Sequence, residues 1–206
     1  TKLQDVGGGA AVVIDVNTGE ILAMASYPTY DITRFNELYN ELTADPYLPM
    51  FNRALGGTYS PGSVFKMVTA VAGLESGAIT PDTVITCTGR YTYYKLYQPT
   101  CWLWAYGLTH GDETVVDALR DSCNIFFYET GRRAGIETLS EYAHAFGLGN
   151  YTGIELSGEK KGYVASPESM KALNNTSWVD GDTLQAAIGQ SCNLFTPLQI
   201  CNYIAT

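Results

Sequence analysis

A serine and a lysine separated by two residues are the first candidates for covalent chemistry. Ser63 follows Pro61-Gly62, and Lys66 stands three positions later in a run that is apolar almost to Glu75. On a helix, side chains three positions apart share one face and can contact each other. A lysine that burial keeps neutral can accept the proton of a serine and so make it nucleophilic. N–H groups at the start of the helix can stabilise the oxyanion that then forms.

A second candidate element is Ser122-Cys123-Asn124. Its hydroxyl could relay a proton between a leaving group and the lysine, and its amide could orient the lysine and a substrate. Both elements recur in the chain, as Ser157 with Lys160 and as Ser191-Cys192-Asn193. Because Ser and Asn are favoured helix caps, a copy of the second element by itself indicates a cap more than a catalytic group. The Pro-Gly turn before Ser63 and the apolar run after it distinguish this serine from Ser157.

The cysteines and one histidine offer a different chemistry. A closed structural zinc site needs four ligands, and Cys87, Cys101, His110 and Cys123 could supply three thiolates and one imidazole. Cys123 would then tie the zinc site to the serine and asparagine beside it. The spacing is not that of a compact zinc finger, and two other interpretations stay open: a disulfide between Cys87 and Cys101, or buried free thiols. The chain has five cysteines, so at least one is unpaired.

Composition and charge limit the class of protein. The chain has 206 residues, of which 46% are hydrophobic and 16% are charged, as in a globular domain with one sizeable core. The formal net charge is −9 and basic residues form no cluster larger than a pair, so we expect no nucleic acid partner. Neither an apolar run long enough to span a membrane nor a basic-then-apolar leader is present. We therefore expect any export signal or membrane anchor to lie upstream of Thr1.

The candidate groups must be positioned by a core that mixes strands and helices. Apolar runs, turn residues and helix-ending glycines predict an α+β fold with a helical portion in the middle. We expect a β-hairpin buried on both faces, then helices and short strands. The predicted elements are the hairpin at 10–25, a short helix at 34–42, a central helix at 63–75, short strands or a long hairpin at 84–109, helices at 114–131 and 138–146, a loop with short strands at 148–175 and the start of a helix at 197–206.

Several stretches resemble the class B penicillin-binding proteins, the monofunctional transpeptidases. Tyr59-Ser60-Pro61-Gly62-Ser63-Val64-Phe65-Lys66 closely resembles their nucleophile motif. Residues 117–127 are similar to their second motif, which favours Ser122 and Asn124 over the later copy. Further similar stretches are Asp15-Val16-Asn17-Thr18-Gly19-Glu20-Ile21-Leu22-Ala23-Met24, Gly153-Ile154-Glu155-Leu156 and residues 189–199. The resemblance covers essentially the whole chain.

The resemblance implies a fold and a reaction. The fold would be α+β, of the serine β-lactamase and penicillin-binding transpeptidase type, with a central antiparallel sheet and a helical subdomain. The reaction would be D,D-transpeptidation of peptidoglycan, in which Ser63 forms an acyl-enzyme with a stem peptide ending in D-Ala-D-Ala. Lys66 would be the general base, and Ser122 and Asn124 would relay the proton and orient the substrate. β-Lactams would acylate the same serine, catalysis would need no cofactor, and some clostridial-type members carry zinc near the active site.

The resemblance also implies cell-wall synthesis proteins as partners, and a membrane-anchored full-length protein at the extracytoplasmic face of the bacterial membrane. The family's third motif, Lys-Thr/Ser-Gly on a strand that lines the cleft, is absent from the 206 residues. We therefore expect an incomplete transpeptidase domain at 1–206 that ends before this strand and lacks the later strands; an inactive scaffold is the alternative. A β-lactam sensor domain is a second alternative, less favoured because the similar stretches match biosynthetic enzymes. Deacylation should be slow, since no carboxylate is placed to activate water.

Overall fold

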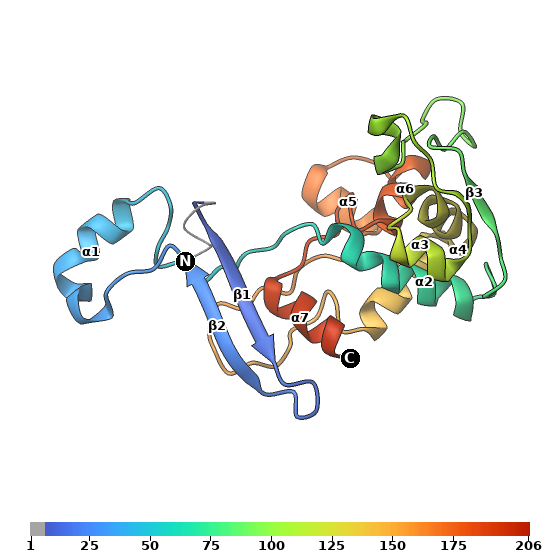
Figure 1. Ribbon diagram of the computed structural model, residues 1–206. Coiled ribbons are helices and arrows are strands. Elements are labelled where there is room, and N and C mark those ends of the chain that lie inside the picture. The colour runs from blue at the N-terminus through green and yellow to red at the C-terminus, as the bar shows by residue number, and fades with distance from the viewer. Residues whose placement is uncertain (1–6) are drawn as a thin grey trace. The chain divides into compact units, whose positions relative to one another are not determined.

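The computed structural model describes residues 7–206, and the chain divides into two compact units (Figure 1). The hairpin unit contains the described residues up to Tyr59 together with Gly147–Gly162 and Phe195–Thr206. The helical unit contains Ser60–Phe146 and Tyr163–Leu194. Ser63, Lys66 and all four predicted zinc ligands belong to the helical unit.

The hairpin unit is built on two antiparallel strands and one helix. Strands β1 (Gly9–Ile14) and β2 (Ile21–Tyr27) pair in the register Gly9↔Tyr27 to Val13↔Ala23. Helix α7 (Pro197–Ala205) packs against β1, with the thiol of Cys201 directed to the Val12 carbonyl. The predicted hairpin is confirmed, but burial on both faces is wrong, because Val13 is 50% and Leu22 63% exposed. Two strands and one helix form too thin a layer to cover both faces.

The connection after the hairpin is irregular, as predicted, and holds one short helix. The 3₁₀ turn η2 (Ile32–Arg34) leads directly into α1 (Phe35–Ala44), which confirms the helix predicted at 34–42. The chain then runs to Arg53, whose guanidinium donates to the carbonyls of Tyr47, Leu48 and Phe51. These bonds hold the connection in place without regular structure.

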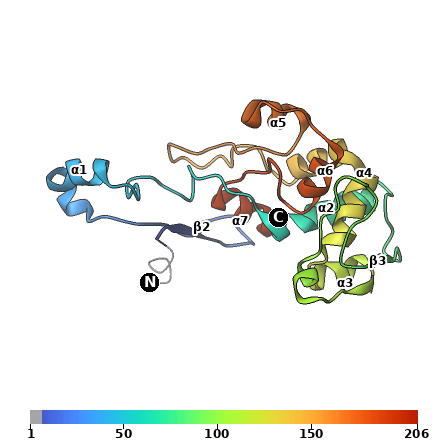
Figure 2. The same ribbon diagram turned by 90° about the horizontal axis from the view of Figure 1, so that it is seen from above.

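The helical unit is arranged around a long helix, α4 (Asn124–Ala145), whose backbone breaks at Gly135. Helix α2 (Lys66–Glu75) packs against it and begins in the 3₁₀ turn η3 (Gly62–Phe65). Helices α3 (Val115–Arg120) and α6 (Asp180–Ala187) also contact α4, and Figure 2 shows these helices gathered around it. The predicted central helix is confirmed: Val68 and Ala72 are fully buried, and Gly77, with φ of +74°, follows its last turn.

Two short strands lie beside the helices, β3 (Ile85–Cys87) against α4 and β4 (Gly111–Glu113) against α3. The two strands pair antiparallel, and the 3₁₀ helix η4 (Trp102–Tyr106) lies between them in sequence. Of the strands predicted at 84–109, the structure has β3, while its partner β4 lies just beyond that range. The single helix predicted at 114–131 is wrong, because Ser122 takes a left-handed conformation (φ +52°) that separates α3 from α4. Helix α5 (Pro167–Asn174) stands where the sequence predicted a loop.

Candidate active site and metal cluster

Two close backbone segments position Ser63. The N–H of Gly62 donates to the carbonyl of Gly189 over 3.0 Å, and both glycines have positive φ. A Cβ atom on Gly189 would collide with the Gly62 carbonyl and lie 2.7 Å from the Cβ of Phe65, so glycine is required there. Ser63 follows this contact on an exposed surface. The sequence Pro-Gly-Ser thus begins a helix whose first hydroxyl faces solvent.

Lys66 lies one 3₁₀ turn after Ser63. Its backbone N–H donates to the Ser63 carbonyl, and in such a turn side chains three positions apart eclipse each other. The two side chains therefore lie on one face of the helix, as the spacing predicts. Within residues 7–206, no hydrogen bond joins the Ser63 hydroxyl to the Lys66 amine. Catalytic hydrogen bonds often form only when substrate binds.

The ammonium group of Lys66 is buried among three oxygen acceptors. Lys66 is 2% exposed, and its Nζ donates to the Ser122 carbonyl (2.8 Å), the Ser122 hydroxyl (3.0 Å) and Asn124 Oδ1 (2.7 Å). The Nζ atom also lies 5.6 Å from the ring centre of Phe127. Burial lowers the pKa of Lys66 to about 8, although the thiols of Cys101 and Cys123 act in the opposite direction. A lysine with this pKa is neutral in a useful fraction of molecules near neutral pH.

The turn that carries Ser122 and Asn124 is held at both ends. Helix α3 begins at a capping box between Thr114 and Asp117, and α4 begins directly at Asn124. The left-handed φ of Ser122 is uncommon for a residue with a side chain and brings its hydroxyl to Lys66. The Asn124 N–H donates to the sulfur of Cys101 over 3.3 Å.

The later copies of both elements lie elsewhere. Ser191 repeats the left-handed φ (+59°), but the side chain of Asn193 accepts from the Ala165 N–H and donates to the Ala186 carbonyl, both over 3.0 Å. Asn193 therefore satisfies buried backbone groups. Ser157 is exposed in a turn of the hairpin unit. The structure thus places Lys66 beside Ser122 and Asn124, whereas Asn193 of the later copy has a packing role.

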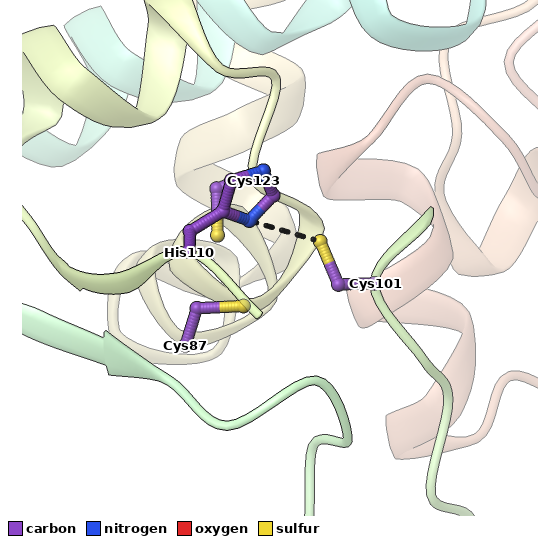
Figure 3. A group of neighbouring side chains, drawn as sticks. All are labelled: Cys87, Cys101, His110 and Cys123. Atoms are coloured by element: carbon purple, nitrogen blue, oxygen red, sulfur yellow. Dashed lines mark hydrogen bonds between the residues drawn. The ribbon is translucent and has the colours of Figure 1, made fainter. Parts of the chain in front are cut away.

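The four predicted metal ligands lie together. Cys87 ends β3, Cys101 precedes η4, His110 precedes β4 and Cys123 precedes α4, and their ligand atoms all lie within 4.8 Å of one another. Figure 3 shows the three sulfur atoms and the near ring nitrogen of His110 directed toward a common space. The His110 Nδ1 atom is 3.5 Å from the Cys101 sulfur. All five cysteines are free, so no disulfide joins Cys87 to Cys101.

The donor set fits a zinc ion. Three sulfurs and one imidazole form a tetrahedral structural site, in which Zn–S bonds of about 2.3 Å place the sulfurs about 3.8 Å apart. Separations of up to 4.8 Å require only small shifts to reach this geometry. The Cys123 thiol and N–H groups at the start of α4 hydrogen-bond to Cys101 and hold its pKa well below the usual thiol range. Cys101 is thus prepared to act as a thiolate.

A carboxyl group that sequence reasoning did not select lies beside this cluster. Glu113 is 2% exposed, and burial raises its pKa although the charge of His110 opposes this. The pKa of the neighbouring Asp121 is lowered by Arg120 foremost and also by a hydrogen bond with Glu113. In the sequence, Glu113 follows Gly and Asp and is typical of an exposed turn. Glu113 becomes buried only because the chain segments that carry the predicted metal ligands fold against the helices.

Comparison with known proteins identifies the family. Residues 9–206 match the family described as the penicillin binding protein transpeptidase domain. The chain belongs to this family. Peptidoglycan D,D-transpeptidase MrdA of Escherichia coli K12 is 35% identical over 209 residues, which are 94% of this chain and 31% of that protein. MrdA of Haemophilus influenzae is 35% identical over 93% of this chain and 30% of its own length. The chain thus spans about a third of the relatives it matches.

Solved structures of the family have the same fold. PBP2 of Helicobacter pylori in complex with MreC superposes with a TM-score of 0.89 at 34% identity, over 99% of this chain and 38% of that chain. Pseudomonas aeruginosa PBP2 in complex with WCK 5153 gives a TM-score of 0.85 at 30% identity, over 99% and 49%. The resemblance to class B transpeptidases and the expected fold class are confirmed. In the described part of the chain, no helix combines the length and apolar character needed to cross a membrane.

Proposed function

We propose that the protein containing this chain is a peptidoglycan D,D-transpeptidase with Ser63 as its nucleophile. The observation that carries the proposal is the buried Lys66 amine, which shares a helix face with Ser63 and contacts both Ser122 and Asn124. The relatives named peptidoglycan D,D-transpeptidase support it.

The contacts of Lys66 account for the acylation step. Neutral Lys66 has a lone pair that accepts the proton of Ser63, and the serine oxygen then attacks the carbonyl carbon of the penultimate D-Ala. The resulting ammonium has three N–H donors, and the three oxygen acceptors around Nζ match them. The site is thus preorganised for the charge that forms during the reaction.

The Ser122 hydroxyl connects the two halves of the reaction. It accepts from Lys66 in the structure, so it can take a proton from the ammonium while it donates its own to the departing D-Ala amine. This breaks the peptide bond and leaves an ester on Ser63. In the second half, an amine from another strand attacks the ester, the proton returns along the same path and Ser63 is regenerated.

The proposed substrates and partners follow from the family. The donor is a stem peptide ending in D-Ala-D-Ala, and β-lactams acylate Ser63 in its place. The H. pylori PBP2 that resembles this chain is in complex with MreC. We infer that the protein works with other cell-wall synthesis proteins at the extracytoplasmic face of the membrane, where an anchored enzyme reaches its substrate.

Duplicated motifs provide a matched test of the transpeptidase proposal. The assay mixes a labelled D-Ala-D-Ala stem peptide with an acceptor amine and follows D-Ala release and the cross-linked product. We expect Ser63→Ala to lose both products and Ser157→Ala, in the exposed copy of the motif, to keep them. Equal activity of wild type and Ser63→Ala would contradict the proposal. A stable penicillin adduct without cross-linking would indicate a sensor instead.

We also propose that Cys87, Cys101, His110 and Cys123 hold a structural zinc ion. Its contribution is to cross-link β3, η4 and the start of α4, and it takes no part in the acyl transfer. Metal analysis should find one zinc per protein, lost in Cys87→Ser and retained in Cys201→Ser. Cys201 is a suitable control because it belongs to the hairpin unit and is not one of the four clustered residues. Metal-free wild-type protein after expression with zinc would contradict the site.

A further inference from the structure

The two ring nitrogens of His110 have different surroundings. Nδ1 faces the cluster, 3.5 Å from the sulfur of Cys101. Nε2 is buried and has no hydrogen-bond partner among the described residues. Burying a ring N–H without a partner is unfavourable, so native structures rarely leave one. A metal-bound imidazole nearly always donates its other N–H to an oxygen.

Glu113 offers the matching acceptor. Its Oε2 atom is likewise buried and has no partner within residues 7–206. The β3 and β4 strands hold it near the cluster: Cys87 pairs with Gly111, which follows His110, and Ile85 pairs with Glu113. An electrostatic interaction already couples the Glu113 carboxyl to His110. A buried imidazole nitrogen and a buried carboxyl oxygen, each without a partner among the described residues, therefore lie within the same short segment around β4.

We propose that Glu113 is a positioning residue of the metal cluster, whose Oε2 accepts a hydrogen bond from His110 Nε2–H. This bond fixes the imidazole tautomer in which Nδ1 keeps its lone pair for the metal. The inference rests on the proposed zinc site and adds to it a residue that is not a ligand.

The same side chain connects the cluster to the candidate active site. Asp121, whose pKa Glu113 helps to lower after Arg120, directly precedes Ser122, and Cys123 directly follows it. The left-handed turn at Ser122 is therefore flanked by a ligand on one side and by a residue coupled to Glu113 on the other. The cluster and its carboxylate together restrain the turn that contacts Lys66.

Zinc affinity tests the role of Glu113 without any measurement of activity. The dissociation constant of zinc is measured by chelator competition for wild type, Glu113→Ala, Glu113→Gln and Glu137→Ala. Loss of the carboxyl should weaken zinc binding by about 10–100-fold, the usual effect of removing such a partner. Glu113→Gln keeps an oxygen acceptor and should recover part of this loss. Glu137, an exposed carboxylate of α4 outside the cluster, is the matched control and should bind as wild type does.

Nitrogen-15 NMR of the zinc-loaded wild type gives an independent readout, needed if Glu113→Ala does not fold. We expect His110 to show a metal-bound Nδ1 and an Nε2–H that exchanges slowly with water. A rapidly exchanging Nε2–H, or zinc affinity of Glu113→Ala within twofold of wild type, would overturn the role of Glu113. Wild-type protein that binds no zinc would instead overturn the zinc site itself, so the two failures are distinguishable.

Discussion

A carboxylate placed beside Lys66 should shift the pH dependence of acylation. With a pKa of about 8, Lys66 is neutral in about 9% of molecules at pH 7 and about 91% at pH 9, so the acylation rate should rise about tenfold between them. Asn124 Oδ1 is 2.7 Å from Lys66 Nζ. Asn124→Asp puts a negative charge at this distance, which typically raises the pKa of a lysine by about 1–3 units. At pH 7 the neutral fraction then falls at least about tenfold.

The assay measures the second-order rate constant of acylation by a fluorescent penicillin from pH 6 to 9.5, with protein-free samples to correct for hydrolysis. The wild-type rate should be half-maximal near pH 8 and approach its plateau above pH 9, and the midpoint for Asn124→Asp should move at least one unit higher. Loss of substrate orientation lowers the rate at every pH, so only the midpoint reports on Lys66. Asn174→Asp adds the same charge on exposed α5 and should leave the midpoint unchanged. A wild-type rate that does not change with pH would refute Lys66 as the base. An Asn124→Asp midpoint that stays at the wild-type value, as the Asn174→Asp midpoint should, would refute it as well.

Three further predictions concern the framework of the site. Gly189→Ala places a Cβ 2.7 Å from the Cβ of Phe65 at a residue with positive φ. It should lower the free energy of unfolding, measured by urea denaturation, by about 2 kcal/mol or more, and an unchanged urea midpoint would contradict the close packing. Asn193→Ala should lower stability by about 1–3 kcal/mol and leave the acylation rate of folded protein unchanged, whereas Asn124→Ala should slow acylation about a hundredfold; an unchanged rate for Asn124→Ala, or a slowed one for folded Asn193→Ala, would contradict these roles. Burial raises the pKa of Glu129, but hydrogen bonds from two arginines and a tyrosine outweigh it and lower this pKa to about 2. The stability that the ionised carboxylate contributes is therefore complete above pH 4.5 and is lost as pH falls toward 2. Glu129→Gln should be less stable at pH 6 and lose less stability on acidification, and parallel pH curves for the two proteins would contradict this.

Local signals allowed the helix that begins at Ser63 to be predicted. Pro61-Gly62 begins it, an apolar run buries it and Gly77 follows its end, all within a few residues of Ser63. The hairpin strands were predictable for the same reason. Their exposure was not, because burial of a strand face depends on elements distant in sequence.

The break at Ser122 could not be predicted from local sequence. Apolar spacing continues across residues 114–131, and the left-handed serine carries no propensity signal. Contacts with Lys66, far away in the chain, accompany the break. The metal cluster was predictable in its residue types but not in its geometry, since its four ligands come from separate elements. Glu113 was missed because a carboxylate in a polar stretch indicates an exposed position.

Intact-mass spectrometry with a labelled penicillin, followed by peptide mapping, tests whether Ser63 is the nucleophile. We expect a single adduct with the mass of the penicillin on the peptide that contains Ser63, stable over hours and absent from Ser63→Ala. Ser157→Ala should form the adduct at the wild-type rate. A folded wild-type protein that forms no adduct, or one that is labelled at Ser157 or a cysteine instead, would contradict the assignment of Ser63 as the nucleophile.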